Sequence, residues 1–143
     1  MNPPLELAER LKEVAVETLK MYEERNTLAH VRRVSSTFLK RLHALREHPL
    51  VGEATGIGLL GGIELVADKT TKLNFPPAKA VGQTCANFAQ DEGLLVRALL
   101  SDRVAFCPPL IITEAEIDEM FDRFVRALDK TEAWVRREEL RAP

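Results

Sequence analysis

The spacing of apolar residues changes at His48-Pro49, and this change is the strongest constraint on the fold. Before it, apolar side chains recur every three or four residues, which is the period of an amphipathic helix. We expect one helix over residues 5–24 and a second that begins near Leu28 and ends at His48-Pro49, because proline disfavours the α conformation in the residue before it. The two apolar stripes consist of Ala8, Leu11, Ala15, Leu19 and Tyr22, and of Leu28, Val31, Val34, Phe38, Leu42 and Leu45.

After the proline, residues 50–66 predict two short strands. In the second strand, every other residue is apolar, and Gly61 lies between them on the same face. The apolar residues are Ile57, Leu59, Ile63 and Leu65. Four glycines, Gly56, Gly58, Gly61 and Gly62, weaken a strand unless a turn or a close approach needs them. A phosphate-binding loop is disfavoured, because the Walker lysine is missing and no helix follows directly. A tight hairpin is the favoured interpretation.

The second half of the chain predicts a helix, two strands and a last helix. Residues 78–92 return to helical spacing through Val81, Cys85 and Phe88, and Gly93 suits the helix C-terminus. Strands are expected at 94–99 and 103–107, joined by a tight turn. Thr113 and Glu116 form a capping-box pattern, and Ile112 and Ile117 occupy the positions of a hydrophobic staple. The stripe of the last helix comprises Ile117, Phe121, Phe124, Leu128 and Val135.

This element order predicts an α+β fold, with helices packed on a small, mainly antiparallel sheet of three to four strands. The strand–helix–strand series is too short for a doubly wound parallel sheet. With 143 residues, the chain suits a single domain that buries its own core.

Composition excludes several classes of partner. Twenty basic residues oppose 22 acidic ones, and a net charge of -2 gives no general attraction to nucleic acid or to an anionic membrane. No apolar run approaches the roughly 18–20 residues that span a bilayer. The N-terminal residues show no basic segment followed by an apolar one, so we expect a cytoplasmic protein. Cys85 and Cys107 are most simply free thiols, with a single disulfide as the alternative.

Arg97 is the most unusual residue of the predicted strands. It shares a strand face with Leu95 and Leu99, where an unpaired buried charge would be costly. A guanidinium suits a carboxylate or phosphate. The pattern alone favours a structural explanation, either an internal ion pair with Glu64 or Asp102 or exposure at a sheet edge, because structural ion pairs outnumber substrate-binding arginines.

Other reactive residues lack the context that chemistry requires. Glu64 is interpreted as a residue of the solvated strand face. His30, His43 and His48 have no further metal ligands at suitable spacing, so we expect no metal site. Ser101 has no evident base beside it, so no nucleophilic triad is predicted.

Two stretches together resemble the C-terminal part of class-III aminotransferases. They are "GIGLLGGIELV" at 56–66, which fits G-x-G-L-x-x-x-I-E-L-V, and "GLLVRALLSDRVAFCPPLIITEAEIDE" at 93–119. The resemblance extends over roughly residues 14–135 and is strongest to omega-transaminases that use pyruvate. These are fold-type I enzymes that depend on pyridoxal phosphate.

The resemblance implies that Arg97 matches the family's mobile arginine, which binds the substrate carboxylate. It also implies two regions in one unit, an entry helix at 1–26 and the C-terminal small domain at 27–143. The family's Schiff-base lysine, its other cofactor contacts and the large domain match nothing in this chain. We therefore expect no catalytic, cofactor-binding or metal-binding residues, and no pyridoxal phosphate bound to this chain alone.

The function implied by the resemblance is therefore that of a fragment or domain of an aminotransferase, which transfers an amino group from an amine or amino acid to a keto acid such as pyruvate. We expect the chain alone to be inactive, so whether it counts as an enzyme stays open. Its expected partners are an amino or keto acid carboxylate, the missing large domain and a second copy of itself. The alternative is a non-catalytic domain for interaction or self-association.

Overall fold

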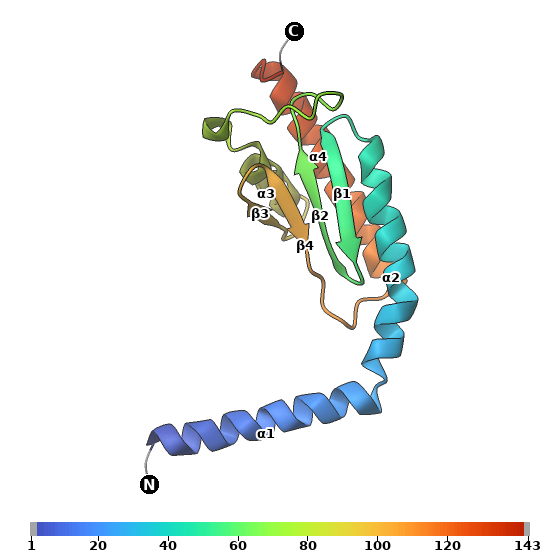
Figure 1. Ribbon diagram of the computed structural model, residues 1–143, viewed down its shortest axis with the longest axis vertical. Coiled ribbons are helices and arrows are strands. Elements are labelled where there is room, and N and C mark those ends of the chain that lie inside the picture. Colours follow the sequence, from blue (N-terminus) through green and yellow to red (C-terminus); the bar gives the residue numbers. More distant parts are fainter. Residues whose placement is uncertain (1–2, 142–143) are drawn as a thin grey trace.

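The structure is a computed structural model that describes residues 3–141, with four α-helices and one four-stranded sheet in that range (Figure 1). This arrangement confirms the predicted α+β fold. The helices are α1 (Pro3–Glu24), α2 (Thr27–Ala44), α3 (Val81–Asp91) and α4 (Glu114–Arg137), and the strands are β1 (Val51–Ile57), β2 (Leu60–Leu65), β3 (Arg97–Leu99) and β4 (Arg103–Phe106). None of the described helices is long and apolar enough to cross a membrane.

The sheet has the order β1-β2-β4-β3, and each neighbouring pair is antiparallel. Figure 1 shows α3 and α4 behind the strands, so one sheet face is covered by helices and the other is open. Side chains alternate accordingly, because successive residues of a strand point to opposite faces. Ala54, Ile63 and Val104 are buried beneath the helices.

Two tight turns set the register of the hairpins. Gly58 connects β1 to β2 and has a φ of 59°, a left-handed value that glycine adopts at little cost. Leu100, Ser101 and Asp102 connect β3 to β4, and the ladder closes on the pair Leu99 and Arg103. Ser101 and Asp102 have left-handed φ values of 60° and 52°.

The strand bounds differ from the predicted ones. Ile57 ends β1 and is 78% exposed, whereas Leu59 lies in the turn, so the alternation expected through both residues was wrong. Gly61, Ile63 and Leu65 do share the buried face of β2. The strand predicted at 94–99 is paired only over Arg97–Leu99.

Two glycines of the first hairpin allow α2 to approach the sheet. A Cβ atom on Gly56 or on Gly61 would lie 2.7 or 2.6 Å from a side-chain methyl of Leu42. The predicted tight hairpin is therefore confirmed, and its glycines serve both the turn and the packing of a helix. Phe38, which follows the same side of α2, contacts Phe121 of α4 with ring centroids 5.4 Å apart.

The start of α4 has the predicted local structure. The Thr113 hydroxyl accepts a hydrogen bond from the Glu116 backbone N–H at 3.3 Å, and the Glu116 carboxylate accepts one from the Thr113 N–H at 2.8 Å. This reciprocal pair is a capping box, which satisfies two otherwise unpaired donors at the helix end. Ile112 and Ile117 are both buried, as the predicted staple requires.

Helix α1 is formed as predicted, but its apolar stripe is not covered. Figure 1 shows α1 projecting from the body, which it joins at the turn before α2. Every residue from 7 to 24 is exposed, including Leu11 at 61% and Leu19 at 63%. Leu28, expected on the buried stripe of α2, is exposed as well. Helical spacing therefore predicted a helix correctly, but no described residue covers its apolar stripe.

Candidate functional site

The open face of the sheet is organised in two rows of side chains that run across all four strands. One row contains Thr55, Gly62, Ala105 and Arg97, and the other contains Glu53, Glu64, Arg103 and Leu99. Both rows follow from the strand register, since paired residues of antiparallel strands lie on the same face. Arg97 thus stands at the edge of the sheet, at the end of a row with small residues in its centre.

Arg97 does not form either of the internal ion pairs considered from the sequence. Glu64 instead pairs with Arg103, at 3.4 Å between Oε1 and Nη2. The Asp102 carboxylate accepts a hydrogen bond from the Gly82 backbone N–H at 2.8 Å. Arg97 itself is exposed and makes no ion pair within residues 3–141. Of the structural explanations, exposure at a sheet edge is therefore the one that fits.

An open groove of about 740 Å³ lies beside Arg97, between the β3–β4 hairpin and the segment that leads into α3. Its lining comprises Asn74, Phe75, Pro77, Ala80, Gln83, Arg97, Ala98, Leu99, Leu100, Ser101 and Asp102. Arg97 is the only basic residue of this lining and Asp102 the only acidic one, so an anion in the groove would meet a single guanidinium.

The backbone around Arg97 is held in place from the other side of the hairpin. The Asp102–Gly82 hydrogen bond ties the turn to the first residues of α3. A Cβ atom at Gly82 would lie 2.9 Å from the Asp102 Cα, so glycine is required for this approach. The hairpin that carries Arg97 is therefore attached to α3, whereas the Arg97 guanidinium forms no ion pair with a described residue.

The described residues do not fit a bound pyridoxal phosphate. That cofactor is held through an imine with a positioned lysine. The seven lysines of the chain are all exposed, and none lines the groove beside Arg97: Lys12, Lys20, Lys40, Lys69, Lys72, Lys79 and Lys130. Ser101 lies in the same groove, but the lining contains no histidine that would activate its hydroxyl.

His30 and the two cysteines do not form a metal site or a disulfide. His30 Nε2 lies 2.9 Å from the Ile112 carbonyl oxygen, and its Nδ1 lies 2.8 Å from Arg33 Nη2. Cys85 is buried and Cys107 is exposed, and both are free thiols, so the alternative of a disulfide is wrong. Burial raises the pKa of the Cys85 thiol to about 11. No group of three potential metal ligands occurs in the described part of the chain.

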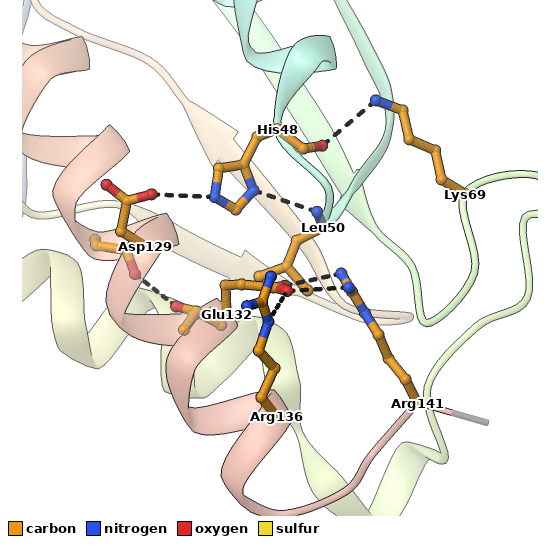
Figure 2. Close-up of polar contacts among 9 residues, drawn as sticks. His48, Leu50, Lys69, Asp129, Glu132, Arg136 and Arg141 are labelled. Atoms are coloured by element: carbon orange, nitrogen blue, oxygen red, sulfur yellow. Dashed lines mark hydrogen bonds and ion pairs between the residues drawn. The ribbon is translucent and has the colours of Figure 1, made fainter. Parts of the chain in front are cut away.

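A polar cluster at the end of α4 was not predicted from the sequence (Figure 2). Glu132 is only 7% exposed and accepts hydrogen bonds from Arg136 Nε at 2.7 Å and from Arg141 Nη2 at 2.8 Å. A second Arg141 contact, from Nη1 at 3.0 Å, makes that pair bidentate. The burial of Glu132 could have been predicted from the sequence, because Glu132 lies four residues after Leu128 and therefore on the apolar stripe of the helix.

His48 completes this cluster and fastens the start of β1 to α4. Its Nδ1 accepts a hydrogen bond from the Leu50 N–H at 3.2 Å, and its Nε2 lies 3.4 Å from Asp129 Oδ1 (Figure 2). Burial lowers the pKa of His48 below its ordinary value, and Asp129 offsets part of this effect. Neither His48 nor Asp129 lines the groove beside Arg97.

Comparison with known proteins gives a consistent family. Residues 11–128 match the family model described as Aminotransferase class-III. The chain is 39% identical over 119 residues to gamma aminobutyrate transaminase 3, chloroplastic, of Solanum lycopersicum, which covers 83% of this chain and 23% of that protein. It is 37% identical over 123 residues to the putrescine–pyruvate aminotransferase of Pseudomonas aeruginosa, which covers 85% and 26%.

Solved structures agree with these relatives. A thermostable omega transaminase from Pseudomonas jessenii matches with a TM-score of 0.80 and 40% identity, over 85% of this chain and 27% of that one. The omega-transferase from Vibrio fluvialis JS17 matches with a TM-score of 0.82 and 38% identity, over 86% of this chain and 29% of that one. The chain thus spans about a quarter of the length of the relatives it matches. On these matches of sequence and fold, the chain belongs to the class-III aminotransferase family.

Proposed function

We propose that this chain supplies the part of a class-III aminotransferase that binds the substrate carboxylate, with Arg97 as the binding residue. The observation that carries the proposal is the free guanidinium of Arg97, held on a fixed strand beside an open groove. The names of related proteins support the chemistry. One relative is a putrescine–pyruvate aminotransferase, and one similar structure is described as a transaminase with L-alanine. Both pyruvate and alanine carry one carboxylate.

Catalysis would require more than this chain provides. One similar structure is described as the pyridoxamine-phosphate-bound form of an aminotransferase from Vibrio fluvialis. The described residues of this chain offer no enclosed lysine for such a cofactor, so we propose that the chain is inactive alone and works with a large domain. Its cytoplasmic location, and the division into an entry helix at 1–26 and a small domain at 27–143, stay predictions.

A complementation experiment tests this function. The chain is mixed with a fragment of the Pseudomonas jessenii omega transaminase that lacks the segment matching this chain, and amino transfer to pyruvate is measured. We expect activity from the mixture only. With Arg97→Ala, KM for alanine should rise, whereas KM for an amine without a carboxylate should stay the same. Arg32→Ala removes an exposed arginine of α2 and serves as the control.

Two results would contradict the proposal. If Arg97→Ala leaves KM for alanine unchanged in an active mixture, Arg97 does not bind the carboxylate. If the two fragments associate without any activity, the alternative of a non-catalytic interaction domain is favoured. The specific observation behind that alternative is the uncovered apolar side of α1.

A further inference from the structure

We propose that Glu64 limits the open sheet face to one available guanidinium and so selects substrates with a single carboxylate. The inference rests on the proposed function of Arg97 as the carboxylate-binding residue. It concerns a second arginine, Arg103, which lies on the same face and pairs with Glu64.

Arg97 and Arg103 are diagonal neighbours on the open face. Arg103 pairs with Leu99 across the β3–β4 ladder, and Arg97 lies two residues from Leu99 on the same side of β3. Diagonal neighbours in an antiparallel pair are about 7–8 Å apart, which is within reach of two long side chains. Arg97 lines the groove described above, Arg103 lines a neighbouring hollow of the open face, and Leu99 lines both. A dicarboxylic acid that spans Leu99 would meet both guanidinium groups.

Glu64 removes Arg103 from this arrangement. The Glu64 carboxylate contacts Arg103 at 3.4 Å, and the two residues are also paired across the β2–β4 ladder. The Glu64 side chain is 23% exposed and that of Arg103 is 58% exposed, so the carboxylate is the more buried partner of the pair. The nearest other carboxylate of that row, Glu53, faces Lys72 at 3.5 Å instead. Arg103 therefore pairs with Glu64, whereas Arg97 forms no ion pair with a residue of the described chain.

The chemical consequence is a choice between two kinds of keto acid. A monocarboxylate needs only Arg97. The second carboxylate of a dicarboxylate would have to displace Glu64 from Arg103, and it would meet the negative charge of Glu64 as it approached. Glu64 acts through Arg103 and is a positioning residue. Its removal should therefore change the affinity for dicarboxylates relative to that for monocarboxylates, and not the affinity for every anion.

The test is a titration of the full chain with pyruvate and with 2-oxoglutarate, which share a keto-acid group and differ in the second carboxylate. Binding is followed by NMR through the Nε–Hε signals of the arginines, and amide spectra verify that each variant is folded. In the parent chain, both acids should bind weakly and shift the Arg97 signal. In Glu64→Gln, 2-oxoglutarate should gain about three- to fivefold over pyruvate, a modest factor because exposed ion pairs are weak, and the Arg103 signal should shift as well.

Two further variants separate this effect from simple charge. Glu47→Gln makes the same change in net charge away from the open face and should leave the ratio of the two dissociation constants unchanged. Arg103→Ala leaves Glu64 unpaired. Binding of 2-oxoglutarate should then weaken relative to that of pyruvate, because the negative charge of Glu64 repels the second carboxylate. Arg103 is 58% exposed, so this variant tests the proposal even where Glu64→Gln disturbs the fold.

The outcomes are distinguishable. If both Glu64→Gln and Arg103→Ala leave the ratio at the parent value, the inference is wrong, although Arg97 can still bind a carboxylate. If Arg97→Ala leaves the response to pyruvate intact, the carboxylate site itself is wrong, and the inference fails with it.

Discussion

At the scale of single residues, the surface charges of this chain differ in how strongly the fold engages them. Glu92, at the C-terminal end of α3, is held by Arg126 Nε and Lys130 Nζ, each at 2.6 Å. The hydrogen bonds from Lys130 and then Arg126 lower the pKa of Glu92 from 4.5 to about 2. This carboxylate joins α3 to α4, whereas Arg97 and Lys79 carry charges that no described residue compensates.

The pKa of Glu92 predicts a loss of stability in acid. The folded-state pKa of Glu92 lies below its ordinary value of 4.5, so the contribution to stability is fully present above that pH and is lost as the pH falls toward 2. Glu92→Gln should be less stable than the parent at pH 7, and the gap between their urea midpoints should close near pH 2. Glu47→Gln changes an exposed residue of the short 3-10 helix Leu45–Glu47, so it is the control and should follow the parent at every pH. If the difference between the two urea midpoints were as large near pH 2 as at pH 7, the ion pairs of Glu92 would not contribute to stability.

At the scale of elements, the start of α4 depends on one reciprocal pair of hydrogen bonds. Thr113→Ala removes the hydroxyl that accepts from the Glu116 N–H, and should cost about 1 kcal/mol in the free energy of unfolding. Thr113→Ser keeps the hydroxyl and should recover most of the loss. Chemical denaturation with both variants measures the difference. Identical midpoints for the parent and Thr113→Ala would mean that the capping box is not formed in solution.

The elements also show which features a sequence can reveal. The capping box, the helix-ending Gly93 and the glycine hairpin were predictable because each depends on residues a few positions apart. The ion pairs of Glu64 and Glu132 join residues whose proximity follows from strand register or from the path of the chain after α4. The stripe of α1 was visible, but its lack of cover was not, since spacing identifies an apolar face and not its partner.

At the scale of the whole molecule, the uncovered side of α1 predicts association. Its large apolar side chains are exposed together along one helix, and apolar patches beyond a few hundred Å² commonly mark interaction sites. We expect a dimer or higher oligomer by light scattering. Leu11→Glu combined with Leu19→Glu should shift the population toward monomer. A monomeric parent chain across the accessible concentration range would contradict this prediction.

The distribution of lysines predicts the response of the whole chain to pyridoxal phosphate. All seven lysines are exposed, and none is enclosed in a site that would position its amine to form a stable imine with the cofactor. Borohydride trapping followed by peptide mapping should therefore find scattered, substoichiometric labelling, and no amino transfer from alanine. One lysine labelled at unit stoichiometry, with turnover that is lost when it is replaced by alanine, would overturn the prediction.

The different surroundings of the two cysteines give the molecule an internal reporter of its own folding. Alkylating reagents react with thiolates, and Cys85 is both shielded and, with a pKa of about 11, largely protonated at neutral pH. Cys107 is open to the reagent. A folded chain should therefore take up one label and an unfolded chain two, so intact-mass spectrometry can count folded molecules without any added probe.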